Sequence, residues 1–320
     1  VNVDTLGKLA ERLQLPATVA DCVMTIAQEH KVVVLIDQLD ALADLVDLRS
    51  ERLNVLLNLI HQLAETSNVY IIASSREFEF NHDTRFQTIQ AEVIQLELPS
   101  WDTVNEVLKQ LNIDGSNWPD SFKEVLRTPQ NLKIFVEHLN GTSEQKIFAS
   151  YQEMLEKLWY QKVTRSTEAG PKKALLGAVA EEMSDKERLW LPIARFDDQR
   201  TILDHLVADG IFKISENGFQ FGFQHQTLFS HARARAFVQN DIDLCDFVIP
   251  RQHALFVRPI LWSILGYTRE ASRQTYSDQI RKLCSETLRF HIRHLLLDFL
   301  GRLEDPDDLE EDLLETWLED

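Results

Sequence analysis

Two continuous apolar runs dominate the first hundred residues. Residues 31–37 (KVVVLID) and 68–76 (NVYIIASSR) are rich in β-branched side chains and do not alternate between apolar and polar positions. They are too short for helices, so they predict strands buried on both faces, as in a parallel sheet. The amphipathic segment 51–67 between them predicts a crossover helix, which makes a parallel βαβ unit. A shorter third strand is predicted at 92–98, stopping at Pro99.

Helical spacing dominates elsewhere. Residues 4–30 predict two helices separated at Pro16, and residues 100–169 predict several more, beginning with Ser100 as an N-cap. The stretch 167–173 (TEAGPKK) predicts a linker.

The segment around residue 215 differs from its helical surroundings. A helix ending at Gly210 precedes two short strands joined by the two-residue turn Asn217–Gly218, which is typical of a winged helix. From about 241 onward helices dominate, and they alternate with short turns as helical repeats do.

These patterns predict an α/β part with a parallel sheet, followed by a mostly α remainder. We expect an α/β domain at 1–98, a helical domain at 99–169, a winged-helix domain at 170–240 and a helical, repeat-like domain at 241–320.

Composition narrows the classes of partner. The 33 Lys and Arg residues are outnumbered by 51 Asp and Glu residues, which gives a net charge of −18. This charge disfavours non-specific binding to nucleic acid or to an anionic membrane surface. No apolar run is long enough to span a bilayer. The three cysteines have no metal-ligand spacing, which predicts unpaired thiols in a reducing, cytoplasmic setting.

Charged residues stand where the two predicted strands end. Asp37 and Asp40 follow the first strand and Arg76 ends the second, and ligands of parallel α/β sheets bind beyond the carboxyl ends of the strands. An acid there can hold Mg²⁺, a second can orient or deprotonate a water, and a guanidinium can contact a γ-phosphate. The alternative is that Asp37 caps the following helix and Arg76 forms an ordinary loop ion pair.

Two further residues carry weaker signals. His225 follows the hairpin, where a lone histidine is more often packed or solvated than a ligand. Pro129 suits the first position of a helix, with Thr128 as its cap. The segment 231–237 could be a basic helix face, although it holds too few cations to indicate nucleic-acid binding.

The order of these motifs resembles the STAND class of P-loop NTPases, the signalling ATPases that include NACHT proteins and NLR receptors. KVVVLIDQLDAL resembles their Walker B strand and VYIIASSR their sensor 1 strand. LRTPQNLKIFVEHL resembles the proline motif of their helical domain, and FQFGFQHQTLFSHARARAF resembles their winged-helix segment. The resemblance runs from about residue 30 to about 240, and bacterial members are the most similar in character.

The resemblance implies an ATPase-type switch controlled by ADP and ATP. Asp37 would organise Mg²⁺, Asp40 would activate water, and Arg76 would be the sensor. Pro129 would lie against adenine and His225 would hold the β-phosphate of ADP. Release of ADP would let the protein oligomerise when it senses a protein partner, as in some bacterial antiviral defence proteins.

One departure from the family is large. The sequence contains no G-x-x-x-x-G-K-[ST] phosphate loop, or Walker A motif. We expect this loop to precede Val1 in a longer parent rather than to have been lost, which leaves an incomplete P-loop sheet here. Alone, the chain is expected to bind nucleotide poorly and hydrolyse it little.

Two other functions remain open. One is a non-enzymatic scaffold that uses its winged helix and helical repeats for protein contacts. The other is a winged-helix transcription regulator. The net charge disfavours it, and so does the helix before the hairpin, which carries almost no positive charge.

Overall fold

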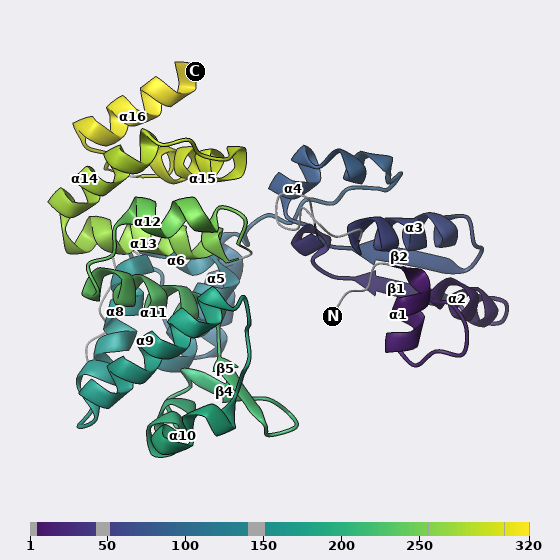
Figure 1. Ribbon diagram of the computed structural model, residues 1–320, viewed down its shortest axis with the longest axis horizontal. Coiled ribbons are helices and arrows are strands. Elements are labelled where there is room, and N and C mark those ends of the chain that lie inside the picture. The colour runs from purple at the N-terminus through teal and green to yellow at the C-terminus, as the bar shows by residue number, and fades with distance from the viewer. Residues whose placement is uncertain (1–4, 43–51, 140–150, 255, 304, 320) are drawn as a thin grey trace. The chain divides into compact units, whose positions relative to one another are not determined.

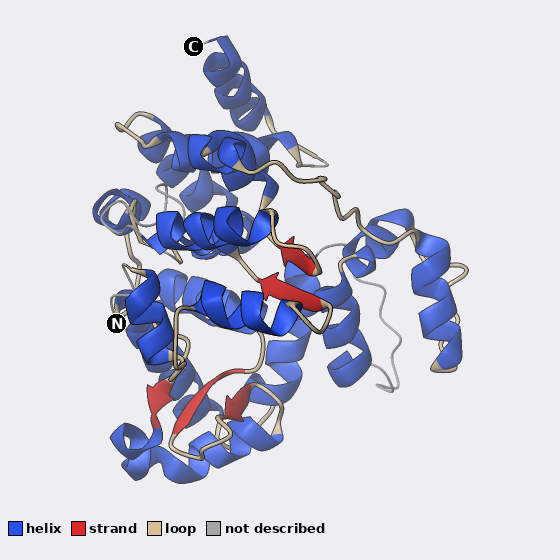
Figure 2. Cartoon of the chain, turned by 90° about the vertical axis from the view of Figure 1, so that its right-hand side faces the viewer, coloured by secondary structure: helices blue, strands red, loops and turns tan. Residues whose placement is uncertain are grey.

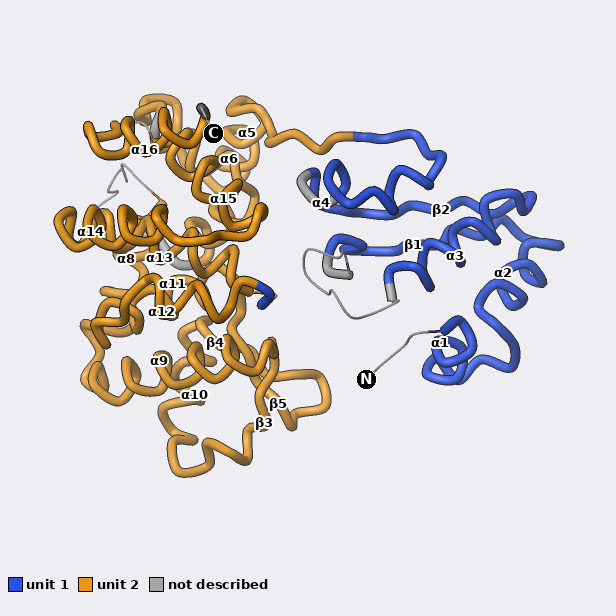
Figure 3. The backbone as a smooth tube through the Cα atoms, turned by 45° about the horizontal axis from the view of Figure 1, so that its top comes forward, with its two compact units in different colours: residues 1–94, 253–255 blue, residues 95–252, 256–320 orange. Residues whose placement is uncertain are grey.

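The computed structural model describes residues 5–42, 52–139, 151–254, 256–303 and 305–319. It divides into two compact units (Figure 3), one made of residues 1–94 with 253–255 and the other of 95–252 with 256–320. Helices make up most of the described chain, beside two small sheets (Figure 2). None of the described helices combines the length and apolarity needed to cross a bilayer. The predicted boundaries near 169 and 240 fall inside the second unit.

The first unit is built on a parallel strand pair. β1 (Val32–Ile36) and β2 (Val69–Ala73) pair in register, from Val32 opposite Val69 to Ile36 opposite Ala73. Between them in sequence lies α3 (Arg52–Ala64), which packs against β2. The predicted parallel βαβ unit is confirmed, because the strands pair as expected and a helix connects them.

The remaining helices of this unit flank the βαβ core (Figure 1). They are α1 (Leu6–Arg12), α2 (Val19–Ala27) and α4 (Glu77–His82). The hydroxyls of Thr5 and Thr18 cap α1 and α2 by accepting bonds from backbone N–H groups. The two predicted helices before β1 are therefore confirmed.

One face of the strand pair supplies the core of this unit. Val34 and Ile71 point toward α3, where Leu59 and Leu63 are almost fully buried, and Ala20 of α2 joins the same cluster. A second cluster around Leu57 and Phe86 continues beneath the carboxyl ends of the strands. Apolar burial on this face therefore anchors the strands to α2 and α3.

The prediction that both strands are buried on both faces is wrong. On the second face Val33, Leu35, Tyr70 and Ile72 expose between 53% and 72% of their surface. The described helices of this unit pack on the opposite face, so β1 alternates between half-buried and exposed positions, and β2 does so up to Ile72.

The predicted third strand at 92–98 is also absent from this described part of the chain. The segment has no regular secondary structure, and Leu96 is 93% exposed. A strand is stabilised by hydrogen bonds to a neighbouring backbone, and no described strand pairs with this segment.

The second unit is mainly helical. Its helices are α5 (Trp101–Gln110), α6 (Asp120–Arg127), α7 (Pro129–Ile134), α8 (Tyr151–Trp159), α9 (Ala169–Asp185), α10 (Arg200–Ala208), α11 (Gln226–Gln239), α12 (Leu244–Val248), α13 (Val257–Ala271), α14 (Arg273–Cys284), α15 (Phe290–Gly301) and α16 (Asp308–Glu319). α5 begins at the predicted N-cap, because the Ser100 hydroxyl accepts from the N–H of Thr103. One of the helices expected between 100 and 169 spans residues 143–163, and its first part, 143–150, lies outside the described residues. The predicted linker at 167–173 is wrong, because Gly170 and Pro171 lie in the first turn of α9, where proline is tolerated.

A three-stranded antiparallel sheet interrupts the helices. Its order is β3 (Leu191–Pro192), β5 (Gln220–Phe223), β4 (Phe212–Ile214). The predicted hairpin is confirmed, with Gly218 at a φ of 75° in its turn. Its loop has four residues rather than two, since Ser215 still donates its N–H to the carbonyl of Gln220.

The later helices form successive layers (Figure 1). α11 packs between α9 and α13, α13 packs on α15, and α14 packs on α16. α13 begins at Val257 and α15 at Phe290, so two helical hairpins follow each other with a spacing of 33 residues. The alternation of helix and short turn predicted from the sequence is present. All three cysteines have free thiols.

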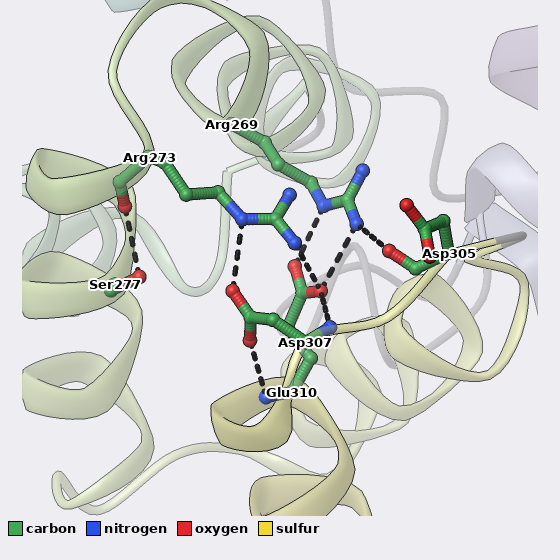
Figure 4. Close-up of polar contacts among 6 residues, drawn as sticks. All are labelled: Arg269, Arg273, Ser277, Asp305, Asp307 and Glu310. Carbon is green, nitrogen blue, oxygen red and sulfur yellow. Dashed lines mark hydrogen bonds and ion pairs between the residues drawn. The ribbon is translucent and has the colours of Figure 1, made fainter.

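A buried carboxylate joins the last helix to this stack (Figure 4). Glu310 in the first turn of α16 has a fully buried side chain that binds Arg269 Nε at 2.7 Å and Arg273 Nη2 at 3.0 Å. The same carboxylate accepts the N–H of Asp307, and Asp307 accepts the N–H of Glu310 in return. This reciprocal pair is a capping box, so one side chain both starts α16 and attaches it to the end of α13 and the start of α14.

We predict that Glu310→Gln weakens the attachment of α16. The substitution keeps the shape but leaves two guanidinium groups without their buried counter-charge, which typically costs 3–5 kcal/mol. Because Arg273 is 41% exposed, we expect a smaller loss of about 2–3 kcal/mol. Hydrogen exchange of the α16 amides measures this loss. Glu311→Gln, an exposed neighbour on the same helix, is the matched control, and equal exchange in both variants would contradict the prediction.

Candidate functional site

The three charged residues predicted to share a site do converge at one edge of the parallel strand pair. Asp37 and Asp40 follow β1, and Arg76 follows β2. Because Ile36 lies opposite Ala73, both strands deliver their following residues to the same edge. Arg76 Nε lies 3.2 Å from Asp40 Oδ2, with the Asp40 side chain 7% exposed and the Arg76 side chain 56% exposed.

Ser74 connects Asp37 to the second strand. Its hydroxyl donates to Asp37 Oδ1 and accepts the N–H of Gln38 at 2.9 Å. Its backbone donates to the carbonyl of Ile36 at 2.9 Å and accepts the N–H of Leu39 at 2.9 Å. The N–H of Leu39, one of the groups that Asp37 could cap, is bonded to the Ser74 carbonyl instead. The other part of the alternative, a loop ion pair of Arg76, is present as its contact with Asp40.

A strained turn places the second acid. Gln38 has a φ of 58°, in the left-handed region that disfavours residues other than glycine. The chain then enters a short 3₁₀ turn over Leu39–Leu42, and Leu39 is buried in the cluster beneath the sheet edge. Because Leu39 is anchored in the core, the adjoining Asp40 is held close to the end of β2.

The donor set suits a magnesium ion that shares its ligands with a phosphate. Mg²⁺ in such sites takes one or two carboxylates and completes its shell with water and phosphate oxygens. Asp37 offers a carboxylate of which Ser74 engages one oxygen, whereas the Asp40 carboxylate beside it in sequence is paired with Arg76. Within the described ranges, no three His, Cys, Asp or Glu side chains gather as a complete metal cage. A magnesium ion at this edge would therefore need phosphate and water oxygens to complete its shell.

The other two predicted residues lie in the second unit, and their helices begin next to each other. Pro129 is the first residue of α7 and is exposed, and His225 is the N-cap of α11. Gln130 Nε2 donates to Thr227 Oγ1 at 3.0 Å, which ties the first turn of α7 to the first turn of α11. Thr128 occupies the N-cap of α7 as predicted, although its side chain makes no capping bond.

The His225 imidazole is mostly enclosed. Its side chain is 9% exposed, and Nε2 lies 3.6 Å from Glu137 Oε2, which is longer than a hydrogen bond. Burial lowers the pKa of His225, and the positive charge of Lys133 lowers it further, while the Glu137 carboxylate partly opposes both. At neutral pH the imidazole is therefore uncharged and one ring nitrogen carries a hydrogen that can be donated.

The basic segment after His225 is not a solvent-facing surface. His231 and Arg233 are 1% and 2% exposed. Arg235 stacks on the rings of Trp159 and Tyr267 and pairs with Glu156. Burial raises the pKa of Glu156, but His231 and Arg235 outweigh this effect and lower it to about 2. These cations are engaged within the protein, so the interpretation as a basic helix face is wrong.

Comparison with models of known protein families gave no match, and comparison with curated proteins gave none.

Sequence reasoning missed the residues that hold these sites together. Ser74 lies in the segment VYIIASSR at 69–76. Its role depends on the register of β1 and β2, which places residue 74 next to Asp37. Gln130 and Thr227 are 97 positions apart. A local pattern carries no signal for a contact over that distance.

We predict that the pKa of His225 can be moved in both directions by its neighbours. Lys133→Gln removes a repulsive charge and raises this pKa, whereas Glu137→Gln removes an attractive one and lowers it. The folded protein loses stability as the pH falls below the ordinary histidine value of 6.5 toward the lowered one, because protonation is less favourable in the folded state. Histidine ring shifts in NMR titrations measure the midpoint. Identical midpoints in both variants would contradict this account.

Proposed function

We propose that this chain is part of a nucleotide-controlled switch of the STAND class, in which ADP or ATP with Mg²⁺ binds at the edge formed by Asp37, Asp40 and Arg76. The observation that carries the proposal is the convergence of two acids and one guanidinium at the carboxyl ends of adjacent parallel strands. Ligand sites of parallel α/β sheets lie at this edge. We take the β1–β2 strand pair as part of a P-loop sheet.

Each of the three side chains has a role that its surroundings support. Asp37 would contact Mg²⁺ through the carboxylate oxygen that Ser74 leaves available. Asp40 would orient the attacking water, and Arg76 would contact the γ-phosphate. In the described arrangement Arg76 is paired with Asp40 at 3.2 Å. Binding of a triphosphate would therefore redirect Arg76 from the carboxylate to the phosphate, since both are anions that match its planar donors. Magnesium would neutralise charge on the phosphates.

The second unit holds a further set of candidate nucleotide contacts, which we propose by itself. We take α9, α10 and the β4–β5 hairpin as a winged helix and the helices before it as the helical domain. Within this unit Pro129 would lie against an adenine ring, and the neutral His225 would donate a hydrogen bond to a phosphate. The support is that Gln130 and Thr227 already join the two helix starts on which these residues lie.

A protein scaffold is the second candidate. It is favoured by the apolar face of the first unit, where Val33, Leu35, Tyr70 and Ile72 are exposed, because solvent-exposed apolar surface of this kind suits a protein contact. The two functions differ in one respect that can be tested, because only the switch requires Asp37 and Arg76 as charged groups.

We predict that Mg²⁺·ADP, although weakly bound because the chain lacks a Walker A motif, shifts the backbone NMR signals of residues 37–40 and 74–76. Loss of an outer-shell partner of a metal ligand already lowers metal affinity about 10–100-fold. Removal of the ligand itself in Asp37→Asn should therefore lower affinity at least about tenfold. Titration of the 320-residue chain followed by NMR measures this affinity. Glu65→Gln, an exposed acid at the end of α3, is the matched control.

A different outcome would favour the scaffold. If Mg²⁺·ADP leaves these signals unchanged, or if Asp37→Asn binds as well as the wild type, the edge is no nucleotide site. Protein capture would then depend on the exposed apolar face and not on the acids.

A further inference from the structure

We infer that Ser74 is a positioning residue that fixes both acids of the proposed magnesium site. This inference rests on the proposed function, because it assigns Ser74 a task toward the ion that Asp37 would hold. Ser74 itself need not touch the ion or the nucleotide.

The Ser74 hydroxyl makes two hydrogen bonds, one as donor and one as acceptor. A serine hydroxyl can donate one hydrogen bond and accept others. At Ser74 it donates to Asp37 Oδ1 and accepts from the N–H of Gln38, so it is joined to both residues at the end of β1. The donated bond fixes which carboxylate oxygen of Asp37 points toward β2 and leaves the other for a ligand.

The backbone of Ser74 continues this connection. Its carbonyl accepts the N–H of Leu39 at 2.9 Å, while its N–H donates to Ile36 on the other side of Asp37. Residues 36, 37, 38 and 39 are thus each bonded to the single residue Ser74. The paired residues of β1 and β2 end at Ile36 and Ala73, so these hydrogen bonds continue the connection between the two chain segments past the last pair.

The hydrogen bonds with Ser74 offset an unfavourable backbone conformation at Gln38. A left-handed backbone conformation is unfavourable for a residue other than glycine, and Gln38 has this conformation with a φ of 58°. Its N–H and that of Leu39 both end on Ser74. The turn that results brings Asp40 within 3.2 Å of Arg76, two residues after Ser74. Ser74 therefore orients the Asp37 carboxylate and also holds the turn that brings Asp40 close to Arg76.

Manganese provides a probe for the ion without any need for nucleotide turnover. Mn²⁺ favours the same oxygen ligands as Mg²⁺ and is detected by electron paramagnetic resonance. The full 320-residue chain is titrated as wild type and as Asp37→Asn, Ser74→Ala, Ser74→Thr and Ser75→Ala. Ser75→Ala is the matched control, because the Ser75 hydroxyl bonds to the carbonyl of Arg76 and not to Asp37.

We expect Ser74→Ala to weaken Mn²⁺ binding about 10–100-fold, as loss of an outer-shell partner does. Ser74→Thr keeps a hydroxyl at an exposed position of the strand end and should restore binding. Ser75→Ala should bind as the wild type does. Thermal unfolding of each variant is followed in parallel. If Ser74→Ala does not fold, Ser74→Cys, with a weak donor and acceptor, takes its place with a smaller loss expected.

Two outcomes overturn the inference and can be told apart. If Asp37→Asn abolishes Mn²⁺ binding but Ser74→Ala does not weaken it, or if Ser74→Thr fails to restore it, the role of Ser74 is wrong while the proposed metal site stands. If the wild type does not bind Mn²⁺, or Asp37→Asn binds equally, the metal site is wrong and the role of Ser74 falls with it.

Discussion

The in-register parallel pairing of β1 and β2 is the constraint on which the candidate site depends. Because Ile36 and Ala73 are the last paired residues, residues 37 and 74 leave the sheet side by side. A shift of the pairing by one residue would exchange the two faces of a strand and separate Ser74 from Asp37. The apolar residues Val34 and Ile71 lie opposite each other in this register, and both pack against Leu59 and Leu63 of α3.

One face of the β1–β2 pair is exposed to solvent, because no described helix of the first unit packs on it. A sheet between two helical layers is normally apolar on both faces, and these strands have that composition. Val33 and Leu35 alternate with Val34, so exposed and half-buried positions are equally apolar. The sequence thus encodes a strand that could be enclosed, whereas the described contacts enclose only half of it.

The fold could be predicted from the sequence wherever its signals are local. Valine-rich runs, the Ser100 cap and the Asn217–Gly218 turn each act within a few residues, and the corresponding strands, helix start and hairpin are present. Apart from the linker expected at 167–173, where Pro171 lies in the first turn of α9, the errors come from non-local causes. The segment 92–98 has the composition of a strand but no described partner, and the burial of His231 depends on helices distant in sequence. For the site, the edge shared by Asp37, Asp40 and Arg76 could be inferred, but the link through Ser74 required the register.

The capping box of α16 has a consequence for how the chain acquires its C-terminal structure. Glu310 can accept the N–H of Asp307 only when the first turn of α16 is formed, and the same carboxylate binds Arg269 and Arg273. Helix nucleation and attachment to the preceding hairpin therefore reinforce each other, since each step pre-orients the group that the other needs. The final helix should consequently form and dissolve as one cooperative unit with its attachment, rather than fray residue by residue.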